Sequence, residues 1–175
     1  METPRITYCV AMSSDGYIAA ENGDVSWLDG IEPDESDKHL EELFADIDGI
    51  VMGRATYNFI YGYGSWPYED KPSWLISSSP AQVLPGARLE QVESIDKFLT
   101  RAEEFSLRHV WLLGGGQLAS GFLERNLVTN LILTRFPLTL GQGIPLFSNH
   151  SLDSINARSR VEYPQKGYER IEIAI

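Results

Sequence analysis

The sequence predicts an α/β fold in which a mostly parallel mixed sheet is flanked by helices and ends in an antiparallel hairpin. Short apolar runs alternate with segments of helical periodicity, which is the pattern of strand–helix–strand units in a parallel sheet. The last two apolar runs, 159–163 and 168–175, are separated only by the turn 164–167. Because no internal repeat, linker or low-complexity stretch interrupts the chain, residues 1–175 are expected to form one domain.

The expected strands are recognised by β-branched and aromatic residues in continuous apolar runs, since strands buried on both faces do not alternate. The first run, 6–12, is expected to be a central strand, and the turn 13–16 leads from it into an extended segment. The further expected extended segments are 17–20, 49–52, 74–76, 87–92, 109–113 and 130–136. The segment 137–150 is expected to be a loop.

Four helices are expected from apolar residues spaced three and four apart. Their apolar residues are Leu40, Leu43, Phe44 and Ile47; Tyr57, Phe59 and Ile60; Ile95, Phe98, Leu99, Ala102 and Phe105; and Leu118, Ala119, Phe122 and Leu123. Ser94 is expected to cap the third helix, because a serine there can accept a hydrogen bond from a free amide of the first turn.

Composition and charge narrow the classes of function. The chain has 25 acidic and 14 basic residues and a net charge of −11, which disfavours nucleic acids and anionic membranes because both attract basic surfaces. No apolar run approaches the roughly 18 residues that cross a bilayer, and no signal peptide is recognisable, so a soluble cytoplasmic protein is expected. Cys9, the only cysteine, is expected to be a small buried residue. His39, His109 and His150 lack the spacing of metal ligands, so no metal site is expected.

The stretch 109–118 combines an apolar run, three glycines and the start of a helical segment. Glycines have no Cβ atom, so they permit positive φ and let a ligand approach the main chain closely. A helix that begins at once presents free N–H groups and the positive end of its dipole to an anion. The functional interpretation is a phosphate site that binds a nucleotide diphosphate. The alternative is a sharp strand-to-helix turn that holds no ligand.

Two neighbouring strand ends carry similar segments, Gly53-Arg54-Ala55-Thr56 and Ser77-Ser78-Ser79. In an open α/β sheet, ligands bind outside the carboxyl ends of the strands. Arg54 can pair bidentately with a phosphate, and Thr56 offers a hydroxyl in the first turn of its helix. Alone, each segment also suits a surface charge, a local cap or a turn. Together, the three strand ends favour a dinucleotide site.

In this order, the motifs resemble the dihydrofolate reductase superfamily. V-M-G-R-A-T-Y follows one expected strand, I-S-S-S follows the next, L-L-G-G-G-Q-L precedes a helix, and A-M-S-S-D-G-Y-I-A opens the chain. The late segment F-P-L-T-L-G-Q-G-I-P-L-F resembles the reductase domain of riboflavin biosynthesis, the RibD C-terminal type, and its stand-alone bacterial relatives. The resemblance covers essentially the whole chain, and it implies a three-layer α/β/α fold and an NADPH cofactor.

The resemblance also implies which residues bind the cofactor. It places Arg54 at the 2′-phosphate of the adenosine, with Ser77 and Ser78 near it, and Ala11 along the nicotinamide. The residues implied to line the pyrophosphate and the adjacent ribose are Gly53, Thr56, Gly114, Gly115, Gly116 and Gln117. An arginine at a helix N-terminus suits a 2′-phosphate, so NADPH is expected to bind in preference to NADH.

The substrate side is implied with less detail. Asp37 occupies the place where folate reductases carry an acidic residue on the first helix, and it is the candidate catalytic residue because an acid suits a substrate that needs a proton beside the hydride acceptor. Asp34, Glu35, Glu41 and Glu42 lie close to it in the sequence. The alternative is therefore that this acidic run complements the dipole of the helix.

Two departures disfavour dihydrofolate as the substrate. Lys71 stands near the place of the arginine that binds the glutamate tail in folate enzymes, and a lysine does not reproduce a bidentate clamp. Glu41 stands where an aromatic residue is expected near the pterin. In the riboflavin branch the substrate is a ribosylaminopyrimidine phosphate, for which Lys71 and Arg135 are the candidate phosphate ligands. Trp27 and Tyr57 are further candidate substrate contacts, Trp27 as a hydrophobic anchor or part of a mobile lid.

Tyr57 belongs to an aromatic group that either lines a planar substrate pocket or packs a loop. The other members of this group are Tyr61, Tyr63, Trp66 and Tyr68. The leading hypothesis is an NADPH-dependent reductase of a small planar or ribosylaminopyrimidine-like substrate. The alternatives are a non-catalytic NADP(H)-binding module and a purely structural α/β domain. The resemblance also implies a homodimer that pairs through the terminal sheet region.

Overall fold

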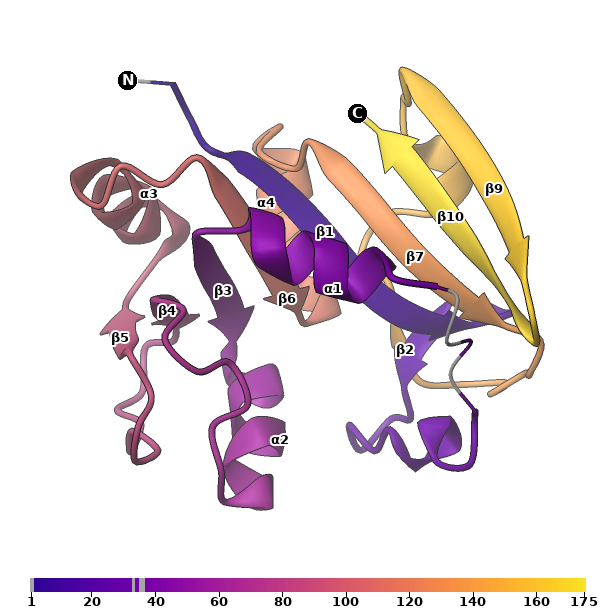
Figure 1. Ribbon diagram of the computed structural model, residues 1–175, viewed down its shortest axis with the longest axis horizontal. Helices are drawn as coiled ribbons and strands as arrows, with labels where there is room; N and C mark the ends of the chain where they lie inside the picture. Colours follow the sequence, from indigo (N-terminus) through magenta and orange to yellow (C-terminus); the bar gives the residue numbers. More distant parts are fainter. Residues whose placement is uncertain (1, 33, 35–36) are drawn as a thin grey trace.

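The computed structural model describes residues 2–32, 34 and 37–175. The strands of its main sheet are β1 (Arg5–Ser13), β3 (Gly49–Gly53), β4 (Ser73–Ile76), β5 (Leu89–Val92), β6 (His109–Gly114), β7 (Asn130–Phe136), β9 (Ser159–Gln165) and β10 (Tyr168–Ala174). Their order across the sheet is β5-β4-β3-β6-β1-β7-β10-β9 (Figure 1). Every neighbouring pair from β5 to β7 is parallel, and β10 runs antiparallel to both β7 and β9. The predicted mixed sheet with a terminal hairpin is confirmed.

Helices cover both faces of this sheet. The helices are α1 (His39–Asp46), α2 (Arg54–Tyr63), α3 (Ile95–Glu104) and α4 (Gly116–Glu124). In Figure 1, α1 lies in front of the sheet and α4 lies behind it. Ile50 and Met52 of β3 pack with buried residues of α1 and α2, whereas Val51 packs with those of α3 and α4. Because successive side chains of a strand point to opposite faces, the predicted three-layer α/β/α arrangement is confirmed.

Most of the predicted apolar helix residues are buried or half-buried, but three are exposed, one of them Phe59 of α2 at 39%. Leu40 on α1 is 51% exposed and Phe105 after α3 is 46% exposed, although the Phe105 ring contacts Trp74 with ring centroids 5.2 Å apart. The predicted cap of α3 is confirmed, because Ser94 Oγ accepts a hydrogen bond from the Lys97 amide at 3.2 Å. None of the helices in the described part of the chain is long and apolar enough to cross a membrane.

A small second sheet lies where a loop was predicted. It pairs β2 (Tyr17–Ala19) with β8 (Ile144–Pro145), inside the segment 137–150. The strand β8 has only two residues, so no periodicity signals it in the sequence. Gly143 explains how the two segments approach: its φ is +159°, and a Cβ atom there would lie 2.2 Å from the Ala19 carbonyl oxygen. The remaining short elements are the 3-10 turns Ser26–Leu28 and Leu152–Ser154.

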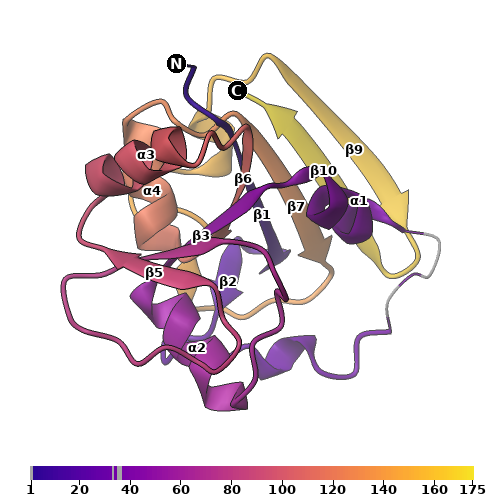
Figure 2. The same ribbon diagram turned by 60° about the vertical axis from the view of Figure 1, so that its left-hand side comes forward.

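The β9–β10 hairpin forms one edge of the molecule, beside α1 (Figure 2). Residues on β9 are largely exposed, and Val161 and Tyr163 present apolar surface there, 44% and 36% exposed. The strand β10 is better covered, because Ile171 and Ile173 belong to the core on the α3 and α4 side. At the start of β10, Tyr168 and Arg170 instead point to the side of α1, where both bond Asp37.

Candidate functional site

The carboxyl ends of β3 and β6 meet at the glycine turn that the sequence singles out. Met52 of β3 pairs with Gly114 of β6, and the turn then enters α4 through its N-cap residue, Gly115. Gly114 has a φ of +137°, which favours glycine, and the Gly114–Gly115 peptide bond is cis. A Cβ atom on Gly53 would lie 3.7 Å from both the Gly114 oxygen and the Gly115 nitrogen. Two of the predicted strand ends therefore form one surface.

Thr56 completes this surface from the first turn of α2. A Cβ atom placed on Gly114 would lie 3.3 Å from Thr56 Oγ1, and one placed on Gly115 would lie 3.9 Å from it. The space above the turn is therefore left open by missing side chains and bordered by a hydroxyl. We call the surface formed by Gly53, Thr56, Gly114 and Gly115 the glycine cradle. Main-chain amides at a helix N-terminus, with no side chain over them, suit a phosphate.

Arg54 ties the glycine cradle to the third predicted strand end. It is the first residue of α2, and its guanidinium donates to Ser77 Oγ at 3.3 Å, to the Ser79 carbonyl at 2.6 Å and to the Pro80 carbonyl at 3.0 Å. The predicted neighbours Arg54 and Ser77 thus lie together, and Ser78 is exposed beside them. A planar cation held over an exposed serine turn is an arrangement that suits a phosphate monoester.

Gly116 and Gln117 have different surroundings from the rest of the turn. A Cβ atom on Gly116 would lie 2.3 Å from the Pro145 carbonyl oxygen, so its missing side chain is needed for β8 to pack against α4. This close backbone contact is sufficient to explain the glycine at position 116, and the contact of Gly116 with a pyrophosphate stays a prediction. Gln117 is exposed on the first turn of α4.

Ala11 lies near the carboxyl end of β1, half-buried, and pairs with Thr134 of β7. Cys9, two residues earlier, belongs to the core on the α1 and α2 side. Because residues two apart on a strand share a face, Ala11 points toward that side as well. Its side chain is a single methyl group, the smallest that still covers this part of the sheet.

Asp37 is buried in a network of polar groups on the same face. Its side chain is 1% exposed and pairs with Arg170, whose Nη1 lies 2.7 Å from Oδ1. The hydroxyl of Tyr168 donates to Oδ2 at 2.6 Å, and His39 Nδ1 lies 2.6 Å from Oδ1. Burial by itself raises the pKa of Asp37, but the hydrogen bonds from Tyr168 and His39 outweigh it and lower the pKa to about 2.

These contacts correct the prediction that Asp37 is the catalytic acid. A carboxyl group with a pKa near 2 is ionised at neutral pH, so it has no proton to donate. Its oxygens are also enclosed by protein donors, which leaves no place for a substrate atom. The structure makes Asp37 an acceptor that orients the groups around it.

Replacement of Asp37 by asparagine should destabilise the protein at neutral pH and matter progressively less in acid. The folded-state pKa lies below the ordinary value of 3.8, so the ionised carboxylate stabilises the fold above that value and its contribution disappears as the pH falls toward about 2. The measurement is the free energy of unfolding in urea for both proteins, from about pH 7 to about pH 2. A difference between them that stays constant over this range would contradict the expectation.

A row of aromatic contacts links Trp27 to this network. The Trp27 ring lies 6.0 Å from Phe136 and the Phe136 ring lies 5.3 Å from Tyr168, centroid to centroid. The Trp27 indole N–H has no hydrogen-bond partner within the described part of the chain. Trp27 and Asp37, which the sequence predicts separately, are therefore brought to one side of the sheet.

Tyr57 and Lys71 do not fit their predicted roles as substrate contacts. Tyr57 is 1% exposed, and its hydroxyl bonds the Gln82 carbonyl at 2.5 Å and the Leu84 amide at 3.1 Å. Lys71 Nζ donates to the Ile47 carbonyl at 2.6 Å and lies over a phenylalanine ring of α1. Both side chains hold loops against helices, so we correct these two predictions.

The remaining aromatic residues of this region likewise do not form one pocket. Tyr61 bonds the Gln82 side chain, and Tyr63 is 71% exposed on the outer side of α2. Trp66 packs against Tyr68, and Tyr68 packs against Trp111 of β6, with centroids 5.2 and 5.8 Å apart. Of the two alternatives that the sequence leaves open, loop packing is the one observed.

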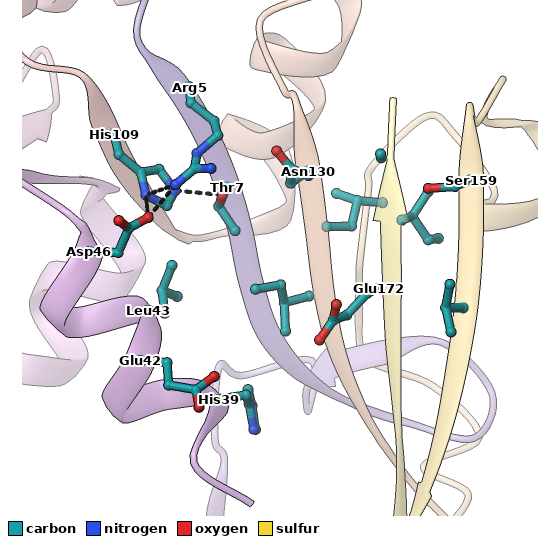
Figure 3. A pocket seen from close by; sticks show the side chains of 15 residues that line it. Arg5, Thr7, His39, Glu42, Leu43, Asp46, His109, Asn130, Ser159 and Glu172 are labelled. Carbon is teal, nitrogen blue, oxygen red and sulfur yellow. Dashed lines mark hydrogen bonds and ion pairs between the residues drawn. The ribbon is translucent and has the colours of Figure 1, made fainter.

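A cavity of about 530 Å³ lies beside α1, between this helix and strands β1, β7, β10 and β9 of the sheet (Figure 3). Arg5, Asp46 and His109 lie together at one end of it, and His39 and Glu42 lie at the other. None of the described residues predicted for the site lines this cavity. His39 is the residue that belongs both to the cavity and to the Asp37 network.

Sequence reasoning missed the partners of Asp37. From the sequence, His39 is weighed only as a metal ligand, and Tyr168 and Arg170 are predicted only to lie in the last strand. Their spacing gave a usable signal, because Tyr168 and Arg170 are two residues apart on an expected strand and so share a face. The described residues contain no group of three or more His, Cys, Asp or Glu that could hold a metal ion.

Residues 4–171 match the RibD C-terminal domain family. The chain belongs to this family. The RibD C-terminal domain seen here is 31% identical over 148 residues to the uncharacterized protein YwjB of Bacillus subtilis (strain 168), covering 84% of each chain. It is 26% identical over 171 residues to the riboflavin biosynthesis protein RibD of Corynebacterium ammoniagenes, covering 91% of this chain and 50% of that one. The chain thus spans about half the length of that relative.

Solved structures confirm the predicted dihydrofolate reductase-like fold of this RibD C-terminal domain. A putative riboflavin biosynthesis protein from Shewanella sp. PV-4 has a TM-score of 0.79 at 25% identity, covering 97% of this chain and 98% of that one. A dihydrofolate reductase from Enterococcus faecalis, complexed with NADP(H), has a TM-score of 0.67 at 16% identity, covering 98% and 96%. The likeness to the second protein is one of fold. The family is of the reductase class, and the Enterococcus faecalis neighbour is a reductase by name.

Proposed function

We propose that this RibD C-terminal domain is an NADPH-dependent reductase that transfers a hydride to a small planar substrate. The observation that carries the proposal is the glycine cradle, where the carboxyl ends of β3 and β6 meet at the N-termini of α2 and α4 and Arg54 links them to the end of β4. Its amides, the Thr56 hydroxyl and the Arg54 guanidinium are the donors that the phosphates of a dinucleotide need. The family match and the NADP(H) complex of the Enterococcus faecalis neighbour support the same choice of cofactor.

The residues present fit NADPH without rearrangement of the sheet. Arg54 would hold the 2′-phosphate beside Ser77 and Ser78, and the glycine cradle would hold the pyrophosphate. Ala11, with its small side chain, would face the nicotinamide, which supplies the hydride when the cofactor is bound. Trp27, packed on Phe136, would exclude water from the reacting atoms.

The charges near Asp37 favour a substrate without a phosphate on this side. Arg170 pairs with Asp37, and Arg135 pairs with Glu169. Lys71, the other predicted phosphate ligand, is held by the Ile47 carbonyl. Carboxylates balance the charges of these two arginines, whereas the partners of Arg54 are neutral oxygens. A planar aminopyrimidine or a small carbonyl compound therefore fits this side better than a ribosylaminopyrimidine phosphate.

Gly115→Ala is the variant that tests the cofactor site most directly. The nearest described atom to the added Cβ is Thr56 Oγ1 at 3.9 Å, which is ordinary contact. We therefore expect the free energy of unfolding to change by less than about 1 kcal/mol. The methyl group would occupy the space of the phosphate, so the NADPH affinity, measured by calorimetry, should fall at least about tenfold. Equal affinities for the two proteins would contradict the proposal.

Activity decides between a reductase and a non-catalytic NADP(H)-binding module. The measurement is the loss of NADPH absorbance with a panel of pterins, aminopyrimidines and small carbonyl compounds. Oxidation that depends on one of these compounds supports the reductase, whereas tight NADPH binding without oxidation supports the binding module. The expected homodimer and the expected cytoplasmic location stay predictions.

A further inference from the structure

We infer that His39, oriented by Asp37, is the residue that gives a proton to the substrate of the proposed reduction. The inference rests on the proposed function, and it replaces Asp37, the candidate from the sequence, by its neighbour. His39 is the first residue of α1, and its side chain is 10% exposed, compared with 1% for Asp37. Of these two side chains, the imidazole is therefore the one that a substrate can reach from outside the Asp37 network.

The contacts of Asp37 fix which nitrogen of His39 carries a hydrogen. An ionised carboxylate accepts hydrogen bonds and cannot donate them. Asp37 Oδ1 lies 2.6 Å from His39 Nδ1, and the same oxygen accepts from the His39 main-chain amide at 3.2 Å. Nδ1 must therefore be the donor, and a carboxylate that accepts from one ring nitrogen also fixes the orientation of the ring. The proton that His39 can take up or release is the one on Nε2.

His39 Nε2 points toward the strand that borders the proposed nicotinamide position. It lies 3.4 Å from Thr134 Oγ1. Thr134 on β7 is paired with Ala11 on β1, so the two side chains share a face and their strands are about 5 Å apart. The proton on Nε2 is therefore one strand away from the residue that we place beside the nicotinamide. It can be transferred to the substrate directly or through the Thr134 hydroxyl.

The groups packed around the imidazole do not offer a second donor of this kind. Asp37 is ionised, and burial raises the pKa of the Cys9 thiol on β1 to about 12, so it does not exchange a proton near neutral pH. Burial and the Asp37 carboxylate raise the pKa of Tyr168 on β10.

Three further groups face the region of the imidazole. Arg170 on β10 pairs with Asp37, and Glu42 from α1 and Glu172 from β10 line the cavity that His39 borders. The two carboxylates line the cavity, and Thr134, the contact of Nε2, is not among the residues that line it. Histidine is the side chain that commonly takes up and releases a proton between pH 5 and 8.

The proposed step balances in atoms and charge. The substrate carbon accepts a hydride, with both electrons, from the reduced cofactor. The protonated imidazole releases the proton from Nε2 to the neighbouring nitrogen or oxygen of the same substrate bond. His39 is left neutral. Its remaining hydrogen is on Nδ1 and is donated in the hydrogen bond to Asp37. A proton from solvent then restores the imidazolium. The substrate gains two hydrogens in total.

A titration of the three histidines by NMR tests this placement without any substrate. We expect the pKa of His39 to be lower by about 0.5 units or more in the NADP⁺ complex than in the NADPH complex, because the oxidised nicotinamide would place a positive charge near the imidazole. His109 and His150 serve as internal controls with the same pKa in both complexes. The measurement is the pH dependence of the imidazole nitrogen resonances of ¹⁵N-labelled protein.

The outcomes of the titration separate the two proposals. If both cofactors saturate the protein and the pKa of His39 is the same in the two complexes, His39 does not face the nicotinamide and the inference is wrong, while the cofactor site stands. If neither cofactor binds, the proposed function fails and the inference fails with it.

His39→Asn supplies a second test, because the asparagine amide can still donate to Asp37 but has no equivalent of Nε2. With a substrate that the wild type reduces, we expect kcat to fall by about 10²-fold or more. The loss of rate on the alkaline side of the pH profile, which reports deprotonation of the imidazole, should disappear, and the NADPH affinity should be unchanged. The control is Lys38→Gln, which changes an exposed neighbour that pairs with Glu41. An unchanged kcat and pH profile in His39→Asn would overturn the inference.

Discussion

Arg54→Gln should weaken NADPH binding by about 10- to 100-fold and leave NADH binding unchanged, because charge-assisted hydrogen bonds contribute about 1.5–3 kcal/mol. The two cofactors differ only in the 2′-phosphate, and Arg54 is the cation beside Ser77 at the proposed position of that phosphate. The measurement is the dissociation constant of each cofactor by calorimetry. An equal loss of affinity for both would show that Arg54 acts on the shape of the loop and not on the phosphate.

The matched control for this variant is Arg88→Gln. Arg88 is an exposed arginine that also donates to a loop carbonyl, that of Asp70 at 2.8 Å, and it lies outside the proposed site. Both variants remove one positive charge from a protein of net charge −11. Long-range repulsion of an anionic cofactor therefore changes equally in both, and the difference between them measures the local contribution of Arg54.

Gly116→Ala should destabilise the protein by about 3 kcal/mol, because the added Cβ atom would overlap with the main chain. The Pro145 carbonyl oxygen would lie 2.3 Å from it, and the Leu146 carbonyl oxygen 3.2 Å. A backbone segment cannot move aside as the end of a flexible side chain can, so β8 would have to separate from α4. The measurement is the free energy of unfolding in urea.

Gly62→Ala is the control for this second prediction, with an effect of opposite sign. Gly62 lies in α2 and is exposed, and a Cβ atom added to it would meet none of the described atoms outside its own helix within 4 Å. Alanine is the better helix former, so this variant should be more stable by about 0.5–1 kcal/mol. A Gly116→Ala protein as stable as the wild type would contradict the close contact with Pro145.

The sequence was sufficient for the sheet, the helices and the convergence of the three strand ends. These features depend on local signals: apolar runs for strands, spacing of three and four for helices, and glycines at strand ends. The glycine cradle and the contact of Arg54 with Ser77 follow from the parallel order of β4, β3 and β6. In a parallel sheet the carboxyl ends lie at one edge, so residues that follow different strands come together.

The substrate side was predicted less well because its contacts are distant in sequence. Asp37 meets Tyr168 and Arg170 across more than 130 positions, through a strand that joins the sheet antiparallel to β7. The burial of single side chains could not be predicted either. Tyr57 lies in an aromatic segment that suggests a pocket, but the loop that carries Gln82 covers it. Composition cannot distinguish an aromatic residue that faces a ligand from one that packs a loop.

The contacts of β8 have a consequence for how this sequence can vary among relatives. Gly116 and Gly143 both lie against main-chain oxygens, at distances that exclude any side chain, whether or not a cofactor is bound. Relatives that keep this backbone arrangement should therefore keep both glycines, even those that have lost the cofactor. Gly53 and Gly115 accept a methyl group without overlap, so only a ligand constrains them. Substitution at these two positions, with Gly116 and Gly143 unchanged, would mark the members of the family that no longer bind a dinucleotide.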